Sequence, residues 1–266
     1  MTYTAAIRLL YDLRVFGLKL GLENTRRLAS LIGDPQDGLR FIHVAGTNGK
    51  GSTCALLEGA YRAAGLRVGL FTSPHLISFR ERIQVNREPI SEADVVRWVT
   101  RMRQSLEAFP RDHAPTFFEV VTVMALGCFA EQQCDLVIWE TGLGGRLDAT
   151  NVLVAPAACG VASLGIDHEA FLLRPEAGTP GDPLARIAFE KASIARPGRP
   201  LVTQSYPAAA ADEVARIAAL AGAFPVVRGQ DWWAGVAGDV ITYRDALGDL
   251  TLPLPSLPGA HQADNA

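Results

Sequence analysis

The sequence has few cysteines, and their spacing suits neither a cross-link nor a metal. The four of them, Cys54, Cys128, Cys134 and Cys159, are scattered, and no two form a C-x-x-C pair. This pattern argues against a disulfide framework and against a zinc site. We expect buried or incidental thiols in a reducing compartment.

An excess of charge, a long apolar run and a leader are also missing. The formal net charge of -3 gives no support for a nucleic-acid-binding surface. No apolar run is long enough to span a bilayer, and Arg8, Asp12 and Arg14 interrupt the apolar residues of the N-terminus, unlike a signal peptide. We therefore expect a cytoplasmic protein that binds neither nucleic acid nor membrane. We also expect a monomer.

One stretch near the N-terminus combines an apolar run, three glycines and a lysine. Phe41 to Ala45 predicts a buried strand, Gly46 to Gly51 a turn, and Cys54 to Ala64 a helix. Such a turn can cradle phosphate, because the N–H groups and the dipole at a helix start favour an anion. We expect the cradle to consist of Gly49, Lys50, Gly51 and Ser52.

The match to the usual phosphate loop is imperfect. Val44 stands six residues before Lys50, where the usual pattern has glycine, and Gly51 separates Lys50 from Ser52. The alternative is a turn that needs glycine for steric reasons alone. The lysine, the hydroxyls and the preceding strand together favour phosphate.

Predicted strands alternate with predicted helices along most of the chain. Strands are expected at 67–71, 135–139, 158–162 and 200–203, and helices at 91–109, 117–126, 184–194 and 208–221. This alternation predicts an α/β fold of the phosphate-loop type, with a doubly wound, mostly parallel sheet flanked by helices. Residues 232–254 predict a small β-hairpin region, and the Pro- and Gly-rich residues 174–183 predict a surface loop.

Polar residues follow three of the predicted strands. Ser73, Glu140 and His168 each come at or shortly after a strand end, where ligands lie in open α/β sheets. Mg²⁺ takes oxygen ligands and waters, so a nitrogen ligand is unusual for it. Alternatively, Ser73 is a turn former before proline, Glu140 caps a helix and His168 is an ordinary loop histidine.

Seven short motifs occur in a characteristic order along the chain. They are Leu20 to Asn24, Gly46 to Ser52, Thr72 to Leu76, Glu140 to Asn151, Asp167-His168, Ile187 to Ala192, and His261-Gln262 with Asn265-Ala266. Together they resemble the folylpolyglutamate synthase / dihydrofolate synthase family of ATP-dependent Mur-type ligases, over essentially the whole chain.

The chain departs from the family in two respects. The loop at 174–183 looks inserted, and the family has a further C-terminal α/β domain. We expect residues 1–258 to form the ATP-binding domain, of N-terminal plus central type. Residues 259–266 are then the start of a linker to an absent C-terminal ligase domain.

The resemblance implies ATP-dependent ligation of L-glutamate to dihydropteroate or to folate polyglutamates, through an acyl phosphate, in folate biosynthesis. It implies ATP and two Mg²⁺ sites, with Ser73 and Glu140 on one ion and His168 helping to hold the second. Asn265 contacts the adenine in similar proteins. The expected catalytic residues are Lys50, Glu140, His168 and Lys191.

Lys191 is carbamylated in similar proteins, which turns a cation into a carboxylate that supports the metal site. The alternative from the sequence alone is an exposed ion pair of Lys191 with Glu190, of little energetic weight, but the matching motif favours carbamylation.

On the folate side, the resemblance implies that the loop at 73–82 closes over the ligand. The residues implied to line the dihydropteroate pocket are Thr116, Phe117, Phe118, Glu119, Leu147, Asp148 and Ala149. Phe117 or Phe118 can stack on a flat ring, although a place in the core of a buried helix explains one of them equally well.

Two other functions stay open. A Mur-type ligase with another acceptor, such as a peptidoglycan precursor, is the first, although Thr72 to Leu76 and the Phe-Phe-Glu helix favour folate. A truncated ATP-binding fragment with little turnover is the second, because the absent domain helps to close the site in similar proteins.

Overall fold

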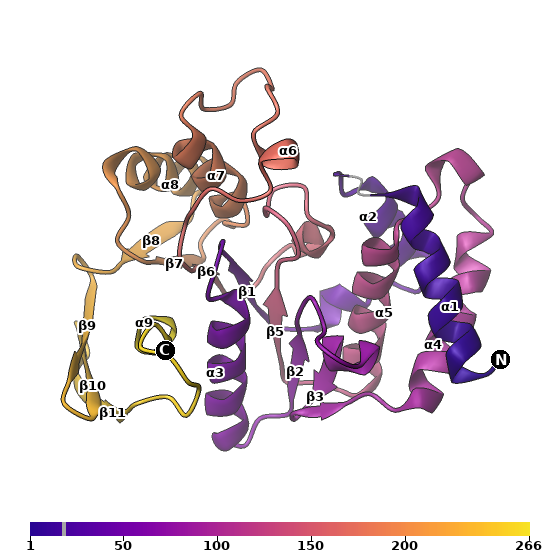
Figure 1. Cartoon of the computed structure of the whole chain (residues 1–266), viewed down its shortest axis with the longest axis horizontal. Coiled ribbons are helices and arrows are strands. Elements are labelled where there is room, and N and C mark those ends of the chain that lie inside the picture. Colours follow the sequence, from indigo (N-terminus) through magenta and orange to yellow (C-terminus); the bar gives the residue numbers. More distant parts are fainter. Residues whose placement is uncertain (18–19) are drawn as a thin grey trace. The chain divides into compact units, whose positions relative to one another are not determined.

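The computed structural model describes residues 1–17 and 20–266, and they cluster into two compact units. Unit 1 comprises Met1–Phe41, Glu58–Gly142 and Leu147–Val154, and unit 2 comprises Ile42–Leu57, Leu143–Arg146 and Ala155–Ala266. The eight strands of the main sheet divide between the units, and Figure 1 labels most of the helices and strands of both. The domain bounds expected from the sequence, 1–258 and 259–266, stay a prediction.

Unit 1 combines four strands with a set of helices. The strands are β2 (Val68–Phe71), β3 (Ile83–Val85), β4 (Glu88–Pro89) and β5 (Leu136–Glu140). The helices are α1 (Tyr3–Asp12), η1 (Leu13–Phe16), α2 (Glu23–Ser30), η2 (Pro35–Gly38), η3 (Phe79–Arg82), α4 (Glu92–Leu106), η4 (Arg111–His113), α5 (Phe117–Glu131) and η5 (Ala149–Val152). β2 pairs with β5 in parallel, whereas β3 and β4 add antiparallel strands at the edge.

Helix α5 is the buried centre of unit 1. Twelve of its 15 residues are buried, as its almost wholly apolar sequence predicts, and it packs against α1, α2 and α4. Thr116 and Glu119 form a capping box at its start: Glu119 N–H donates to Thr116 Oγ1 at 3.3 Å, and Thr116 N–H donates to Glu119 Oε2 at 2.7 Å.

A small residue inside α5 admits a large neighbour from α4. A Cβ built on Gly127 would lie within 3.0 Å of the Trp98 ring, which is itself only 1% exposed. We predict that Gly127→Ala lowers the free energy of unfolding by roughly 1–3 kcal/mol through overpacking, measured by urea denaturation.

Gly59 of α3 (Lys50–Ala63) offers a matched control for that measurement, because a Cβ there meets no atom within 4 Å. Gly59→Ala is expected to raise the free energy of unfolding by about 1 kcal/mol, which is the difference in helix propensity between glycine and alanine. Equal effects of the two substitutions would show that contact with Trp98 does not matter.

Unit 2 contains four parallel strands and a separate small sheet. The parallel strands follow the order β1 (Phe41–Ala45, with Phe41 in unit 1), β6 (Ala158–Val161), β7 (Pro200–Thr203) and β8 (Phe224–Val227). The helices are the first half of α3, then α6 (Glu169–Leu172), α7 (Pro183–Ala192), α8 (Ala208–Ala221) and α9 (Gln262–Asn265). The small antiparallel sheet has the order β11 (Gly248–Pro253), β10 (Val240–Asp245) and β9 (Trp232–Ala237).

Small side chains let α7 and α8 pack closely in unit 2. Ala188 and Ala192 of α7 and Ala210 and Ala218 of α8 are buried in one cluster, together with Leu201 of β7. The inner side of α7 is therefore fixed against the strands, which matters below because α7 carries Lys191.

The predicted fold class is confirmed: a mostly parallel sheet is flanked by helices, and a small hairpin sheet lies near the C-terminus. The helix after the glycine-rich turn begins at Lys50, so the predicted start at Cys54 was wrong; Thr53 N–H already donates to Gly49 O at 2.9 Å. Strand β8 was not predicted, because proline is unfavourable in most strands and β8 contains Pro225. Proline is tolerated here because β8 is an edge strand.

All four cysteines are buried thiols. Among the described helices, none combines the length and the apolar character needed to cross a bilayer.

His43, in β1, makes the free energy of unfolding depend on pH. The side chain is fully buried, and burial, followed by the charge of Arg196, lowers its pKa to about 3. Between pH 6.5 and 3 the unfolded chain therefore binds a proton that the folded chain does not, so stability falls as pH falls through this window. At pH 5 we predict a loss of about 2 kcal/mol relative to pH 7.5 from this histidine.

Urea denaturation at the two pH values checks this prediction. His43→Gln is expected to flatten the difference between them, whereas His113→Gln, at a side chain 75% exposed, should leave it unchanged. A parent-like pH dependence in His43→Gln would contradict the assignment.

Candidate functional site

The glycine-rich loop of unit 2 connects β1 to α3. Gly49 has φ +83°, in the left-handed region that glycine adopts without strain. Since α3 begins at Lys50, Gly51 and Ser52 lie in its first turn, where backbone N–H groups have no partner within the helix. The backbone thus has the form of an anion cradle at a helix N-terminus.

Two of the three lysines in the sequence converge on one carbonyl of this loop. Lys50 Nζ donates to Gly46 O at 2.9 Å and to Thr47 O at 3.2 Å. Lys191 Nζ, on α7, donates to the same Gly46 O at 3.0 Å. Two ammonium groups therefore concentrate positive charge at the loop, where an anion would be bound.

Asp167 completes the surroundings of Lys191. Asp167 Oδ2 lies 3.2 Å from Lys191 Nζ, and Asp167 Oδ1 is buried with no hydrogen-bond partner in the described parts of the chain. Sequence reasoning singled out the motif that contains Asp167 but not the residue itself. The one signal available was its position directly before His168.

Lys191 is 1% exposed, so the alternative interpretation of an exposed ion pair with Glu190 is wrong. Glu190 instead lies 3.0 Å from Arg146 Nη2 and 3.0 Å from Arg186 Nη2. Neighbouring residues of α7 thus point to different partners: Lys191 to the glycine-rich loop, and Glu190 to arginines.

His168 is exposed and has φ +47° at the start of α6. Within residues 1–17 and 20–266, no group of three or more His, Cys, Asp or Glu side chains is arranged to hold a metal. Magnesium sites commonly use only one or two carboxylates together with waters. A magnesium site therefore does not need a group of three such side chains. The metal role of His168 stays a prediction.

Ser73 and Glu140 meet in unit 1. They follow or end the paired parallel strands β2 and β5, in which Phe71 is the partner of Trp139. Ser73 N–H donates to Glu140 Oε2 at 2.9 Å, and Glu140 is 4% exposed. Glu140 is the last residue of a strand, so the alternative that it caps a helix was wrong.

The segment 73–82 after β2 is organised around Glu81. Its carboxylate accepts N–H groups from Leu76 at 2.8 Å, Ile77 at 3.0 Å and Ser78 at 2.5 Å. These bonds, that from Ser78 first, lower the pKa of Glu81. Leu76 and Ile77 are 91% and 95% exposed, so the loop presents two apolar side chains to solvent.

His75 ties the same segment to α1. Arg82 Nε donates to His75 Nδ1 at 2.7 Å, and Tyr11 Oη lies 3.2 Å from His75 Nε2. Because Nδ1 accepts, the proton of the neutral ring is on Nε2. Burial, followed by the charge of Arg82, lowers the pKa of His75.

The expected pterin-side residues fall into two groups within unit 1. Thr116 and Glu119 make the capping box of α5, while Phe117 is 8% exposed beneath the guanidinium of Arg14, at 4.9 Å from the ring centroid. The second group meets at Gly142. A Cβ there would lie within 3.0 Å of the Phe118 ring, and Gly142 N–H donates to Asp148 Oδ1 at 3.3 Å.

Leu147 and Ala149 flank Asp148 in this second group. Leu147 O accepts from Gly21 N–H at 3.1 Å, which joins two of the sequence motifs, and Ala149 is 6% exposed. Asp148 Oδ1 also accepts from Thr150 N–H at 3.0 Å. Phe118 and Asp148 are thus held together, and a ligand role for the group stays a prediction.

Asn265 lies at the glycine-rich loop of unit 2. A Cβ on Gly49 would meet its side chain within 3.0 Å, and Thr53 Oγ1 donates to Asn265 O at 2.9 Å. Asn265 Nδ2 also donates to Gln262 Oε1 at 3.0 Å. The C-terminal turn is therefore fixed against the start of α3, although its expected contact with adenine stays a prediction.

Known proteins resemble the chain over most of its length. A probable bifunctional folylpolyglutamate synthase/dihydropteroate synthase of Halobacterium salinarum is 40% identical over 278 residues, 100% of this chain and 32% of its own. A dihydrofolate synthase/folylpolyglutamate synthase of Bacillus subtilis is 44% identical over 191 residues, 71% of this chain and 42% of its own.

A solved structure of E. coli FolC in complex with DHPP and ADP matches with a TM-score of 0.85 and 33% identity. The match covers 98% of this chain and 60% of that one. The chain spans between 26% and 42% of the length of the first four curated relatives. No family model matches the chain.

Proposed function

Because the chain belongs to the folylpolyglutamate synthase / dihydrofolate synthase family, we propose that it carries the ATP-binding part of a ligase of folate biosynthesis. The reaction joins L-glutamate to dihydropteroate or to folate polyglutamates. ATP phosphorylates the acceptor carboxylate to an acyl phosphate, and the amine of glutamate displaces the phosphate. The observation that carries the proposal is the strand–turn–helix with the left-handed Gly49 at its turn and Lys50, bonded to Gly46 O, at the helix start.

The phosphates bind to the backbone of Gly49, Gly51 and Ser52 and to the ammonium group of Lys50. The loop fits an anion, since the left-handed Gly49 and the helix start at Lys50 leave N–H groups without helical partners. Lys50 supplies positive charge where negative charge develops during phosphoryl transfer. Asn265, beside Gly49, contacts the adenine.

Ser73 and Glu140 hold one Mg²⁺, and His168 helps to hold a second. The donor set suits the metal in part: Glu140 is a buried carboxylate oriented by Ser73 N–H, whereas an imidazole is an unusual ligand for Mg²⁺. Bound magnesium would neutralise charge on the phosphates. The buried Asp167 Oδ1 is a further oxygen available near His168 in sequence.

We infer that Lys191 is carbamylated in the working enzyme. As an amine, Lys191 is satisfied by Gly46 O and Asp167; as a carbamate it would face Asp167 as a second anion and would need a cation nearby. Intact-protein mass spectrometry in bicarbonate tests this inference, with Lys191→Arg as the control that cannot be carbamylated. Equal masses after correction for the substitution would contradict it.

On the folate side, the residues from Thr116 to Glu119 and from Leu147 to Ala149 line the dihydropteroate pocket, and the segment 73–82 closes over the ligand. The contact of Phe118 and Asp148 with Gly142 supports a shared location. The exposed Leu76 and Ile77 provide apolar surface for a closing segment. The protein acts as a cytoplasmic monomer, without nucleic acid or membrane.

A titration with ATP–Mg²⁺, beside an assay of glutamate-dependent phosphate release with dihydropteroate, tests the proposal. Binding together with release is the expected result. Binding without release would instead favour a fragment that needs the remainder of its relatives' length. Release with a muramyl acceptor in place of dihydropteroate would overturn the folate assignment.

A further inference from the structure

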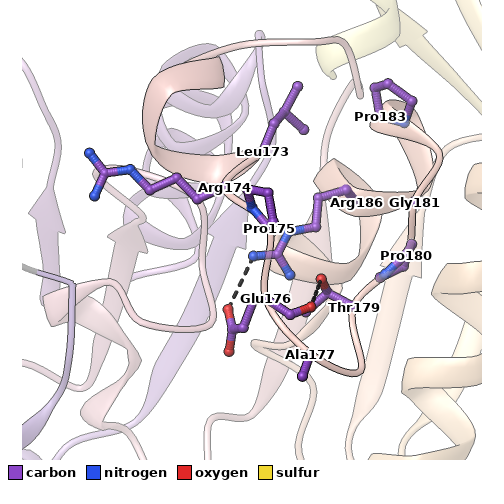
Figure 2. Close-up of a pocket in the computed structure, with 10 residues that line it drawn as sticks. All are labelled: Leu173, Arg174, Pro175, Glu176, Ala177, Thr179, Pro180, Gly181, Pro183 and Arg186. Atoms are coloured by element: carbon purple, nitrogen blue, oxygen red, sulfur yellow. Dashed lines mark hydrogen bonds and ion pairs between the residues drawn. The ribbon is translucent and has the colours of Figure 1, made fainter.

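The loop that looked inserted in the sequence encloses a pocket of its own in unit 2. A cavity of about 510 Å³, within the range of small-molecule sites, is lined by Leu173 to Ala177, Thr179 to Gly181, Pro183 and Arg186 of α7. Figure 2 shows the loop curving around the guanidinium of Arg186. None of the residues assigned above to the phosphates, the metals or the folate lines this pocket.

Arg186 is buried and only partly satisfied. The residue is 4% exposed; Nε donates to Leu172 O at 2.9 Å, and Nη2 lies 3.2 Å from Glu176 and 3.0 Å from Glu190. Nη1 is buried with no hydrogen-bond partner in the described parts of the chain. A buried donor without a partner is costly, and a ligand acceptor would remove that cost.

The charges around the pocket favour an anion. Arg146 and Arg186 are paired with Glu176 and Glu190. Arg174 also lines the pocket, although its Nε donates to Ala170 O and its guanidinium lies over the Phe171 ring. The charged group left to meet a ligand is therefore the guanidinium of Arg186, whose Nη1 has no partner in the described residues. Hydrogen bonding to Arg146 lowers the pKa of Glu176, so that carboxyl stays ionised and paired at neutral pH.

The rest of the lining is mostly apolar. Leu173, Pro175, Ala177 and Pro180 contribute side chains without hydrogen-bonding groups. An inorganic ion would leave this surface in contact with water, whereas a carboxylate on a small apolar body would cover it. The lining therefore offers a ligand both a charged hydrogen-bond donor and apolar contact.

We propose that the pocket around Arg186 is a second ligand site, for a small organic carboxylate whose oxygens bind Arg186 Nη1. This site goes beyond the proposed ligase function and does not depend on it. Helix α7 carries both Arg186 and Lys191. A ligand bound at Arg186 would therefore contact the same helix whose Lys191 bonds to the glycine-rich loop.

Isothermal titration with benzoate, without nucleotide, tests the site. Benzoate is expected to bind one to one with a Kd of about 1 mM. Benzamide, which has the same ring but no charge, and acetate, which has the charge but no ring, should each bind about 10-fold more weakly, the factor expected for one charge-assisted hydrogen bond or a small apolar contact.

Two variants assign the binding to this pocket. Arg186→Lys keeps the charge but loses the planar pair of nitrogens, and Gly181→Leu places a side chain where a Cβ meets open space in the lining. Each should weaken benzoate about 10-fold, while Arg8→Gln, at an exposed arginine of α1, should not change it. Should Arg186→Lys fail to fold, as judged by circular dichroism, Gly181→Leu decides.

Unchanged affinity in the folded variants, equal binding of benzamide and benzoate, or no heat with benzoate up to its solubility would each overturn the proposal. Failure of the ligase assay would leave these measurements unaffected, because they involve neither ATP nor folate.

Discussion

Replacing Lys50 with alanine is expected to weaken ATP binding strongly while leaving the fold intact. The substitution removes a cation from the glycine-rich loop, and a charge-assisted contact of this kind contributes about 1.5–3 kcal/mol, or roughly 10- to 150-fold in affinity. Titration calorimetry with ATP–Mg²⁺ measures the loss.

In protein prepared without bicarbonate, where Lys191 is a free amine, the fold should survive because the loop keeps its second lysine. Gly46 O accepts from Lys191 Nζ at 3.0 Å as well as from Lys50, so removal of Lys50 does not leave the carbonyl without a donor. The free energy of unfolding of Lys50→Ala should therefore stay within about 1 kcal/mol of the parent.

Arg216→Ala is the matched control for a lost cation in unit 2. Its side chain is 46% exposed and pairs with Glu213 on α8, and such surface pairs contribute little. ATP affinity should be unchanged in this variant. Unchanged affinity in Lys50→Ala would instead refute the placement of the phosphates at the loop.

The strand, the turn and the helix around Lys50 could be predicted because their causes are local. An apolar run marks β1, glycines mark the turn, and the following residues have helical character. The start of α3 was the part that local pattern placed wrongly, since Gly51 and Ser52 suggest a turn but lie in the first helical turn.

The partners of Lys191 could not be predicted, because they are distant in sequence. Gly46 lies 145 residues before Lys191, and neither periodicity nor composition records such a contact. The neighbouring Glu190 offered a plausible local partner, yet the structure pairs it with Arg146 and Arg186 instead. Buried charge networks of this kind appear only once the chain is folded.

Replacing Glu140 is expected to raise the Mg²⁺ concentration needed for ATP binding by about 10-fold or more, since a carboxylate ligand is lost. Glu140→Ala also removes the acceptor of Ser73 N–H, which costs about 1–3 kcal/mol of stability. Glu140→Gln keeps an oxygen for that bond and loses only the charge. Both variants should shift the magnesium titration, while only Glu140→Ala should lose much stability.

A second buried carboxylate of unit 1 separates loss of a ligand from loss of buried charge. Glu58 is fully buried and pairs with Arg62 at 2.8 Å and Arg87 at 3.1 Å, so Glu58→Gln should lower stability without moving the magnesium titration. Magnesium titrations of Glu140→Gln that superimpose on those of the parent would remove Glu140 from the metal site. The bond from Ser73 would then be a purely structural link between the ends of β2 and β5.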